Sequence, residues 1–315
     1  MALLDNKKGL DASQPPAPSG SGMLSPLKHK VFATIWFANL ASAFGGVIQS
    51  VGASWLMTSL DPSPTMVALV QASAVAPMMI LSVVGGALAD IYDRRMIMLI
   101  TQIFLAIASA ILAVIAFLGP MSPWTLLTFT FLIGVGAALY TPSWQASIPD
   151  QVPRSDVAGA VSLNAFAFNI SRSLAPAVGG AIIAIAGAFA AFAINAVSYL
   201  GMIWALAKWR PEIPKSDLPH ESLHHAIGAG LRYVSLSPAI NSVLIRSVLF
   251  GFGAAGIWAL MPLIAHDLLK GGPMIYGIVF GAFGAGAMGG ALMTARLRAR
   301  FRSDVIVNYS VAAFA

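Results

Sequence analysis

The side chains best suited to bind a charged or electron-rich molecule lie within long apolar stretches of this sequence. Asn169, Arg172, Pro176 and Gly179 follow one another at intervals of three or four residues, so they share one face of a helix. An arginine at the centre of a membrane span costs about 2.5–3.5 kcal/mol on insertion scales, so it is expected to face a cavity or a partner. Arg246 lies within a later apolar stretch. Each arginine fits either a ligand contact or a structural contact, which for Arg172 would be a tightly packed helix pair.

Polar and aromatic side chains in other apolar stretches are the remaining candidates for a binding cavity. Asn39 begins a row of small and polar residues at helical spacing, and Gln49 lies beside that row. The row comprises Asn39, Ala43, Gly46 and Ser50. Trp144, close to the end of its stretch, is expected to be a membrane-interface anchor. The cavity candidates are therefore Asn39, Gln49, Tyr140, Asn169, Arg172, Arg246 and Trp258.

Acid–base, thiol and metal chemistry find little support in the sequence. The chain has no cysteine, and its 12 carboxylates and five histidines all lie outside the expected spans or at their edges. An enzyme or a metal site needs such groups to converge, so we expect no catalytic residue, no cofactor and no bound metal. A coupled proton would be carried by Asp90, by an acid outside the spans, or by a residue beyond Ala315.

Long apolar stretches recur along the whole chain and set its class. The mean hydropathy is +0.80, and only 10% of the 315 residues are charged. Because about 20 apolar residues cross a bilayer as a helix, the sequence predicts an all-α integral membrane protein. The expected spans cover about 31–55, 66–88, 96–118, 124–146, 157–186, 188–207, 239–264 and 274–294, with a ninth from about 304.

The basic residues predict the orientation of these spans. The formal net charge is +6, and 15 of the 18 lysines and arginines lie on one side if the N-terminus is cytoplasmic. This positive-inside bias predicts a multi-pass protein of the cell (inner) membrane, and it accounts for the charge without a nucleic-acid partner. Residues 1–27, rich in Pro, Ser and Gly, are expected to form a disordered cytoplasmic tail, and 210–236 a polar cytoplasmic bridge.

An internal repeat predicts two related halves. The sequence GGAL at 85–88 returns at 289–292, an offset of 204 residues, and a basic segment follows both copies. The offset fits two six-helix bundles joined by the bridge. We expect the first bundle at 28–209 and an incomplete second bundle at 237–315, truncated within the ninth helix.

The charged loop in GGALADIYDRRMIM, residues 85–98, resembles the signature of the major facilitator superfamily. That signature runs Gly-x-Leu-Ala-Asp-Arg-x-Gly-Arg-Lys after the second span, and this chain departs from it at Ile91 and Asp93. In the family the loop latches the cytoplasmic side of the outward-open state. The resemblance therefore implies a conformational latch at Gly86, Asp90, Arg94 and Arg95.

The segment SRSLAPAVGG, residues 171–180, resembles the exporter motif Gly-x-x-x-Gly-Pro-x-x-Gly-Gly, with Ser171 and Ala175 in place of its first two glycines. It implies hinge and packing roles for Pro176, Gly179 and Gly180. Together with the stretches at 141–181 and 244–292, it is similar to the branch of secretion exporters that includes the enterobactin exporter.

The resemblance implies a major-facilitator-like fold and a secondary active exporter that works by alternating access as a monomer. Its partners would be the lipid bilayer, protons and a siderophore, drug or similar amphipathic small molecule. A permease subunit of an ATP-driven pump and a truncated, non-transporting membrane protein are the alternatives. No Gly-x-x-x-x-Gly-Lys-Ser/Thr loop occurs in the sequence, so a pump would need a partner ATPase.

Overall fold

The computed structural model describes residues 24–211, 232, 235–298, 301, 305–307 and 309–310. In this part of the chain eight helices are long and apolar enough to cross a membrane, which confirms the expected all-α membrane fold. They are α1 (Lys30–Leu60), α2 (Pro64–Ile91), α3 (Arg94–Leu118), α4 (Pro123–Ser147), α5 (Val157–Ala186), α6 (Ala188–Lys208), α8 (Pro238–Leu263) and α9 (Pro273–Arg298). Most of the expected tail (1–27), bridge (210–236) and ninth span (from 304) lies outside the described residues.

Short polar links cap the helices where the sequence turns. Ser63 accepts a hydrogen bond from the Met66 N–H at the start of α2, and Asp93 accepts one from the Arg95 N–H at the start of α3. Each cap satisfies a helix N–H group that has no partner within its own helix. Asp61 begins the link after α1, and a hydrogen bond from the Ser63 backbone N–H lowers the pKa of its carboxyl group.

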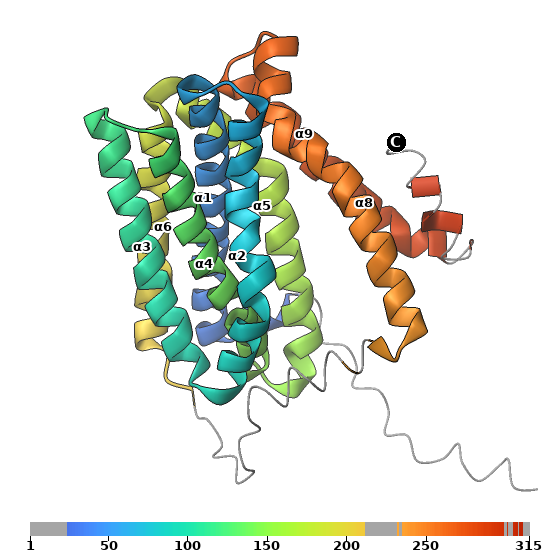
Figure 1. Ribbon diagram of the computed structural model, residues 1–315. Helices are drawn as coiled ribbons and strands as arrows, with labels where there is room; N and C mark the ends of the chain where they lie inside the picture. Colours follow the sequence, from blue (N-terminus) through green and yellow to red (C-terminus); the bar gives the residue numbers. More distant parts are fainter. Residues whose placement is uncertain are drawn as a thin grey trace, which may run out of the picture.

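Helices α1 to α6 pack side by side as one upright bundle (Figure 1). Glycines allow α2 and α4 to approach closely: a Cβ added at Gly85 would lie 2.8 Å from the Ala138 carbonyl oxygen, and one at Gly134 would lie 2.6 Å from that of Ala74. Such small-residue contacts replace the hydrophobic effect as the source of helix association in a membrane.

The charged residues divide the bundle into two unlike ends. One end, where α1, α3 and α5 begin, is called the basic end; the other, which contains the link at 269–272, is called the opposite end. Among the described residues between the spans, the opposite end has one basic side chain, Lys270. The basic end has Lys28, Lys30, Arg94, Arg95, Arg154, Lys208 and Arg210.

Helices α8 and α9 join the bundle at the opposite end and lean away from it toward the basic end (Figure 1). The last turn of α8 is buried there, where Leu263 packs against Met57 of α1 and Val67 of α2. The first half of α8 is exposed among the described residues, with Val243 and Leu249 both more than 60% accessible. The two parts therefore touch at one end and separate toward the other.

Candidate functional site

A cavity of about 370 Å³, called the central cavity below, lies between α1 and α5 on one side and α8 and α9 on the other. Its volume is within the range of small-molecule sites in proteins, and its walls are mainly apolar and aromatic. The lining residues are Ala43, Gly46, Val47, Ser50, Phe168, Ser171, Arg172, Trp258 and Phe280.

Arg172 is the only charged residue among the described residues that line this cavity. Its guanidinium carbon lies 4.8 Å from the centre of the Trp258 ring and 5.4 Å from that of the Phe168 ring. The negative faces of aromatic rings attract a cation at such distances. The two rings hold the guanidinium at the cavity wall, and in the described part of the chain no carboxylate pairs with it. Its charge is available to an anionic ligand.

Helices α5 and α9, which both contribute to the cavity wall, pack tightly against each other. A Cβ added at Gly180 would lie 2.5 Å from the Pro273 carbonyl oxygen, and one at Gly281 would lie 2.8 Å from that of Ser173. Gly284 contacts the backbone of Arg172. The close contacts between α5 and α9 at Gly180, Gly277, Gly281 and Gly284 are called the glycine seam below. Beyond it, a Cβ at Gly286 would meet no atom within 4 Å.

A stack of aromatic rings fills the region between the cavity and the opposite end. Trp258 contacts Phe280 with ring centres 5.4 Å apart, Phe280 stacks on Tyr276 at 5.9 Å, and Tyr276 stacks on Trp55 at 6.4 Å. Tyr276 is buried in a cluster with Ile48 and other apolar side chains. The rings and this cluster close the opposite end of the cavity.

The structure brings two of the seven cavity candidates together, Arg172 and Trp258. Asn39 instead accepts a hydrogen bond of 2.9 Å from the Tyr140 hydroxyl, which joins α1 to α4 away from this cavity. Asn169 donates to the Ala165 carbonyl of its own helix. The remaining two candidates, Gln49 and Arg246, also lie outside the lining.

Gln49 lies in a buried polar cluster between α1, α3 and α6. The Asn195 side-chain amide donates toward Gln49, toward the Ser109 hydroxyl at 3.3 Å and toward the Tyr199 hydroxyl at 3.1 Å. Arg246 is exposed on the half of α8 that stands away from the bundle. The expectation for Trp144 is wrong: it is only 4% exposed, and its indole N–H donates to Asn164 at 2.9 Å.

Replacing Asn195 with alanine is expected to destabilise the protein by about 1–2 kcal/mol, because three buried partners lose a hydrogen-bonding group. The measurement is reversible unfolding of the purified protein in detergent. The matched control is Ser162→Ala, since Ser162 is exposed and bonds only within its own helix. Equal stability of the two variants would contradict a structural role for the cluster.

Phe168 and Phe280 line the cavity although neither was a candidate from the sequence. Phe168 stands four residues before Arg172, on the same helix face. That spacing was an available signal for it. Phe280 had none, since its position depends on how α9 packs against α5.

The expected latch residues lie at the basic end. Arg94 donates to the carbonyl oxygens of Ala89 in α2 and Ala146 in α4, and it pairs with Asp150 at 3.0 Å. Arg95 donates to two carbonyl oxygens in the last turn of α6. These arginines tie the ends of α2, α4 and α6 to the start of α3.

The other two latch residues face outward. Asp90 is exposed, and among the described residues no cation pairs with it. A Cβ added at Gly86 would meet no atom within 4 Å. Gly86 and Asp90, one helical turn apart, thus present an open strip of α2 at the basic end. Their latch role remains a prediction.

The expected hinge and packing residues all lie where α5 meets other helices. Pro176 and Gly180 contact α9 through Gly277, and Gly179 contacts Ile48 of α1. Pro176 is buried within α5. In the described part of the chain, no group of three or more histidine, cysteine or acidic residues could hold a metal ion.

Comparisons with known proteins agree with this architecture. Residues 21–315 match the model of a family described as transmembrane secretion effector. The chain is 27% identical to the staphyloferrin A transporter of Staphylococcus aureus over 79% of its own length and 62% of that protein. It is 24% identical to macrolide efflux protein A of Streptococcus pyogenes over 83% of its own length and 65% of that protein. The chain thus spans less than two thirds of these relatives.

It is also 25% identical to the enterobactin exporter EntS of Salmonella typhi, over 91% of this chain and 69% of that one. Among solved structures, a bacterial homolog of the human lysosomal transporter Spinster, in an inward-facing and unoccupied conformation, matches with a TM-score of 0.66. The match covers 88% of this chain and 64% of that one at 18% identity, so it bears on the fold alone.

Proposed function

We propose that this chain exports small molecules across the membrane. It belongs to the transmembrane secretion effector family, a branch of the major facilitator superfamily. The family comprises membrane transporters rather than enzymes. The finer proposal is a secondary active exporter of an anionic or electron-rich amphipathic molecule, such as a siderophore or a drug.

The observation that carries this proposal is Arg172 between the Phe168 and Trp258 rings in the central cavity. A charge within the membrane is costly, so it is retained where it binds something. The aromatic rings around it offer stacking surfaces, and the guanidinium offers hydrogen bonds to carboxylate or phenolate oxygens. Two similar proteins are named for staphyloferrin A and enterobactin, and another for macrolides.

Alternating access would follow from the contact between the two parts of the molecule. Residues 28–209 would form the first bundle and 237–315 would belong to the second, joined by the bridge at 210–236. In the described state the glycine seam and the aromatic stack close the opposite end, while α8 and α9 diverge toward the basic end.

We propose that the basic end and the N-terminus are cytoplasmic, by the positive-inside rule. The described state would then accept substrate from the cytoplasm.

We further propose that the proton gradient drives export, as an antiport, and that the protein works as a monomer. No carboxylate lines the central cavity among the described residues. Proton transfer would therefore involve acids elsewhere, and Asp90, exposed at the basic end, is the first of these to test.

Deleting the gene from the native host tests the function. Under iron limitation the deletion strain is expected to release at least several-fold less iron-chelating material into the medium and to retain it in the cells. Restoring the gene at the same locus is the control. The measurement is quantification of chelators in the medium and in cell extracts, in parallel with accumulation of a macrolide, erythromycin.

The pattern of outcomes separates the candidate substrates and energy sources. Retained chelator with unchanged erythromycin would assign a siderophore, and the reverse would assign a drug. A protonophore should abolish export while cellular ATP is held constant. Export that survives the protonophore and stops on ATP depletion would overturn the proton-driven proposal, and no change in either compound would overturn export of these classes.

A further inference from the structure

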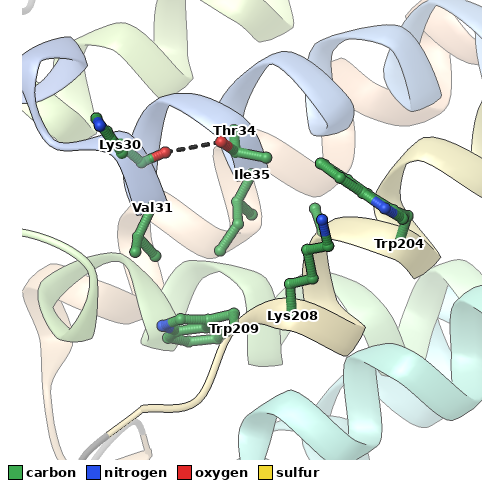
Figure 2. A pocket seen from close by; sticks show the side chains of 8 residues that line it. Lys30, Val31, Thr34, Ile35, Trp204, Lys208 and Trp209 are labelled. Carbon is green, nitrogen blue, oxygen red and sulfur yellow. Dashed lines mark hydrogen bonds between the residues drawn. The ribbon is translucent and has the colours of Figure 1, made fainter.

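A second cavity, of about 170 Å³, lies between the first turns of α1 and the last turns of α6 at the basic end. Ile35, Ala205 and Trp209 line it and are buried, so they form its floor. Figure 2 shows Val31 and Ile35 extending from α1 toward Lys208 and Trp209 at the end of α6. The cavity is called the α1–α6 groove below.

The α1–α6 groove opens on the outer face of the bundle, away from the central cavity. On α6, the exposed side chains of Val197, Leu200 and Trp204 follow one another at intervals of three and four residues. On α1, Val31 and Phe37 are also exposed. No helix in the described part of the chain covers these apolar side chains. In a membrane-spanning bundle, acyl chains cover such a face.

Two lysines stand at the rim of the groove, and no acidic residue lines it. Lys30 is the first residue of α1, and Lys208 is the last residue of α6. The Lys208 ammonium group lies 4.1 Å from the centre of the Trp204 ring, a cation–π contact that holds it at the mouth. The carbonyl oxygens of Leu206 and Ala207 are occupied by Arg95, at 2.7 and 3.0 Å. The ammonium groups are thus the charged groups that the groove offers, beside the Thr34 hydroxyl, which donates to the Lys30 carbonyl oxygen.

We propose that the α1–α6 groove binds an anionic phospholipid, with the phosphate at Lys30 and Lys208 and the upper part of one acyl chain on the apolar floor. Lysines at helix ends place their charge at the depth of the headgroups, and an exposed tryptophan favours the same layer. Basic pockets between helices at a membrane surface suit such headgroups. A free phosphate ion would leave the floor of Ile35, Ala205 and Trp209 without a partner, so the occupant is a lipid.

Brominated lipids test the proposal, because bromine on an acyl chain quenches nearby tryptophan fluorescence. The purified protein is placed in phosphatidylcholine nanodiscs in which a minor fraction of the lipid is brominated phosphatidylglycerol. Matched discs contain the same fraction of brominated phosphatidylcholine. Since the chain has seven tryptophans, the signal from the groove is the difference in quenching between the unmodified protein and Trp204→Phe.

The groove signal is expected to show that phosphatidylglycerol binds in preference to phosphatidylcholine, by about fivefold for each lysine. The double variant K30Q/K208Q should lose that preference. The matched control K28Q/R210Q removes two exposed charges from the same end but leaves the groove lining intact. It should keep the preference, and K30R/K208R should keep it as well.

Three outcomes would overturn the proposal. They are equal quenching by the two lipids in the unmodified protein, a preference that persists in K30Q/K208Q, and an equal loss in K28Q/R210Q, which would indicate a diffuse basic surface. Circular dichroism and gel filtration of each variant establish that it is folded before its quenching is compared. Since the readout is lipid binding, it is independent of the proposed transport activity.

Discussion

Replacing Arg172 with glutamine is expected to reduce export roughly 10- to 100-fold, because a charge-assisted hydrogen bond to the substrate contributes about 1.5–3 kcal/mol. Arg172 is the one charged side chain among the described residues of the cavity lining, and it is held between Phe168 and Trp258. The variant keeps a polar side chain at this position but removes the charge and the guanidinium group. The measurement is initial export rate against internal substrate concentration in the native host.

The chain offers a matched control for this prediction in Arg246. It is also an arginine within a span, but it lies outside the cavity lining on an exposed part of α8. Arg246→Gln should therefore reduce export much less than Arg172→Gln. Equal losses in the two variants would contradict the assignment of the binding site to the central cavity. Arg172→Lys should be intermediate, because lysine keeps the charge but loses the planar fork of donors.

Replacing Gly277 with valine is expected to open the opposite end of the cavity and to destabilise the protein by about 1–3 kcal/mol, the usual effect of overpacking. Gly277 contacts the Pro176 carbonyl, and an added Cβ would also lie 3.0 Å from the Gly180 Cα atom. These are backbone atoms, so they cannot move aside as a side chain can. Helices α5 and α9 should therefore be forced apart along the glycine seam.

The absence of cysteine makes this separation measurable. A single cysteine introduced at Ser50, in the cavity lining, should be protected from a membrane-impermeant maleimide added at the opposite end. In the Gly277→Val background it should be labelled. Gly286→Val is the control, because a Cβ at Gly286 meets no atom within 4 Å. Labelling that is unchanged by Gly277→Val would show that the glycine seam does not close the cavity.

The helices could be predicted from the sequence because apolar length and turn residues determine them. The expected fifth span, 157–186, agrees with α5 (Val157–Ala186), since Gly187 adopts a positive φ that ends the helix. The first span was expected to end at 55 but continues to Leu60. Near its end the Thr58 hydroxyl donates to the Trp55 carbonyl oxygen, so this polar group is satisfied within the helix.

The binding site could be predicted only where a side chain is costly to bury. Arg172 could be identified because its charge requires a cavity or a partner within the membrane. Gln49 and Asn39 are amides in the same helix and look alike in the sequence. Their partners, Asn195 and Tyr140, depend on how α6 and α4 are rotated against α1, which the periodicity of one helix does not specify.

The bonds of Arg94 and Arg95 have a consequence for how this protein can evolve. Apart from the Asp150 pair, their acceptors are backbone carbonyl oxygens, at Ala89, Ala146, Leu206 and Ala207. Every amino acid supplies such an oxygen, so these bonds place no restriction of their own on the side chains at the four positions, although burial restricts those of Ala89 and Leu206. Correlated substitution across related sequences is therefore expected only at the Arg94–Asp150 pair, and it would give no sign of the bonds from the start of α3 to α2 and α6.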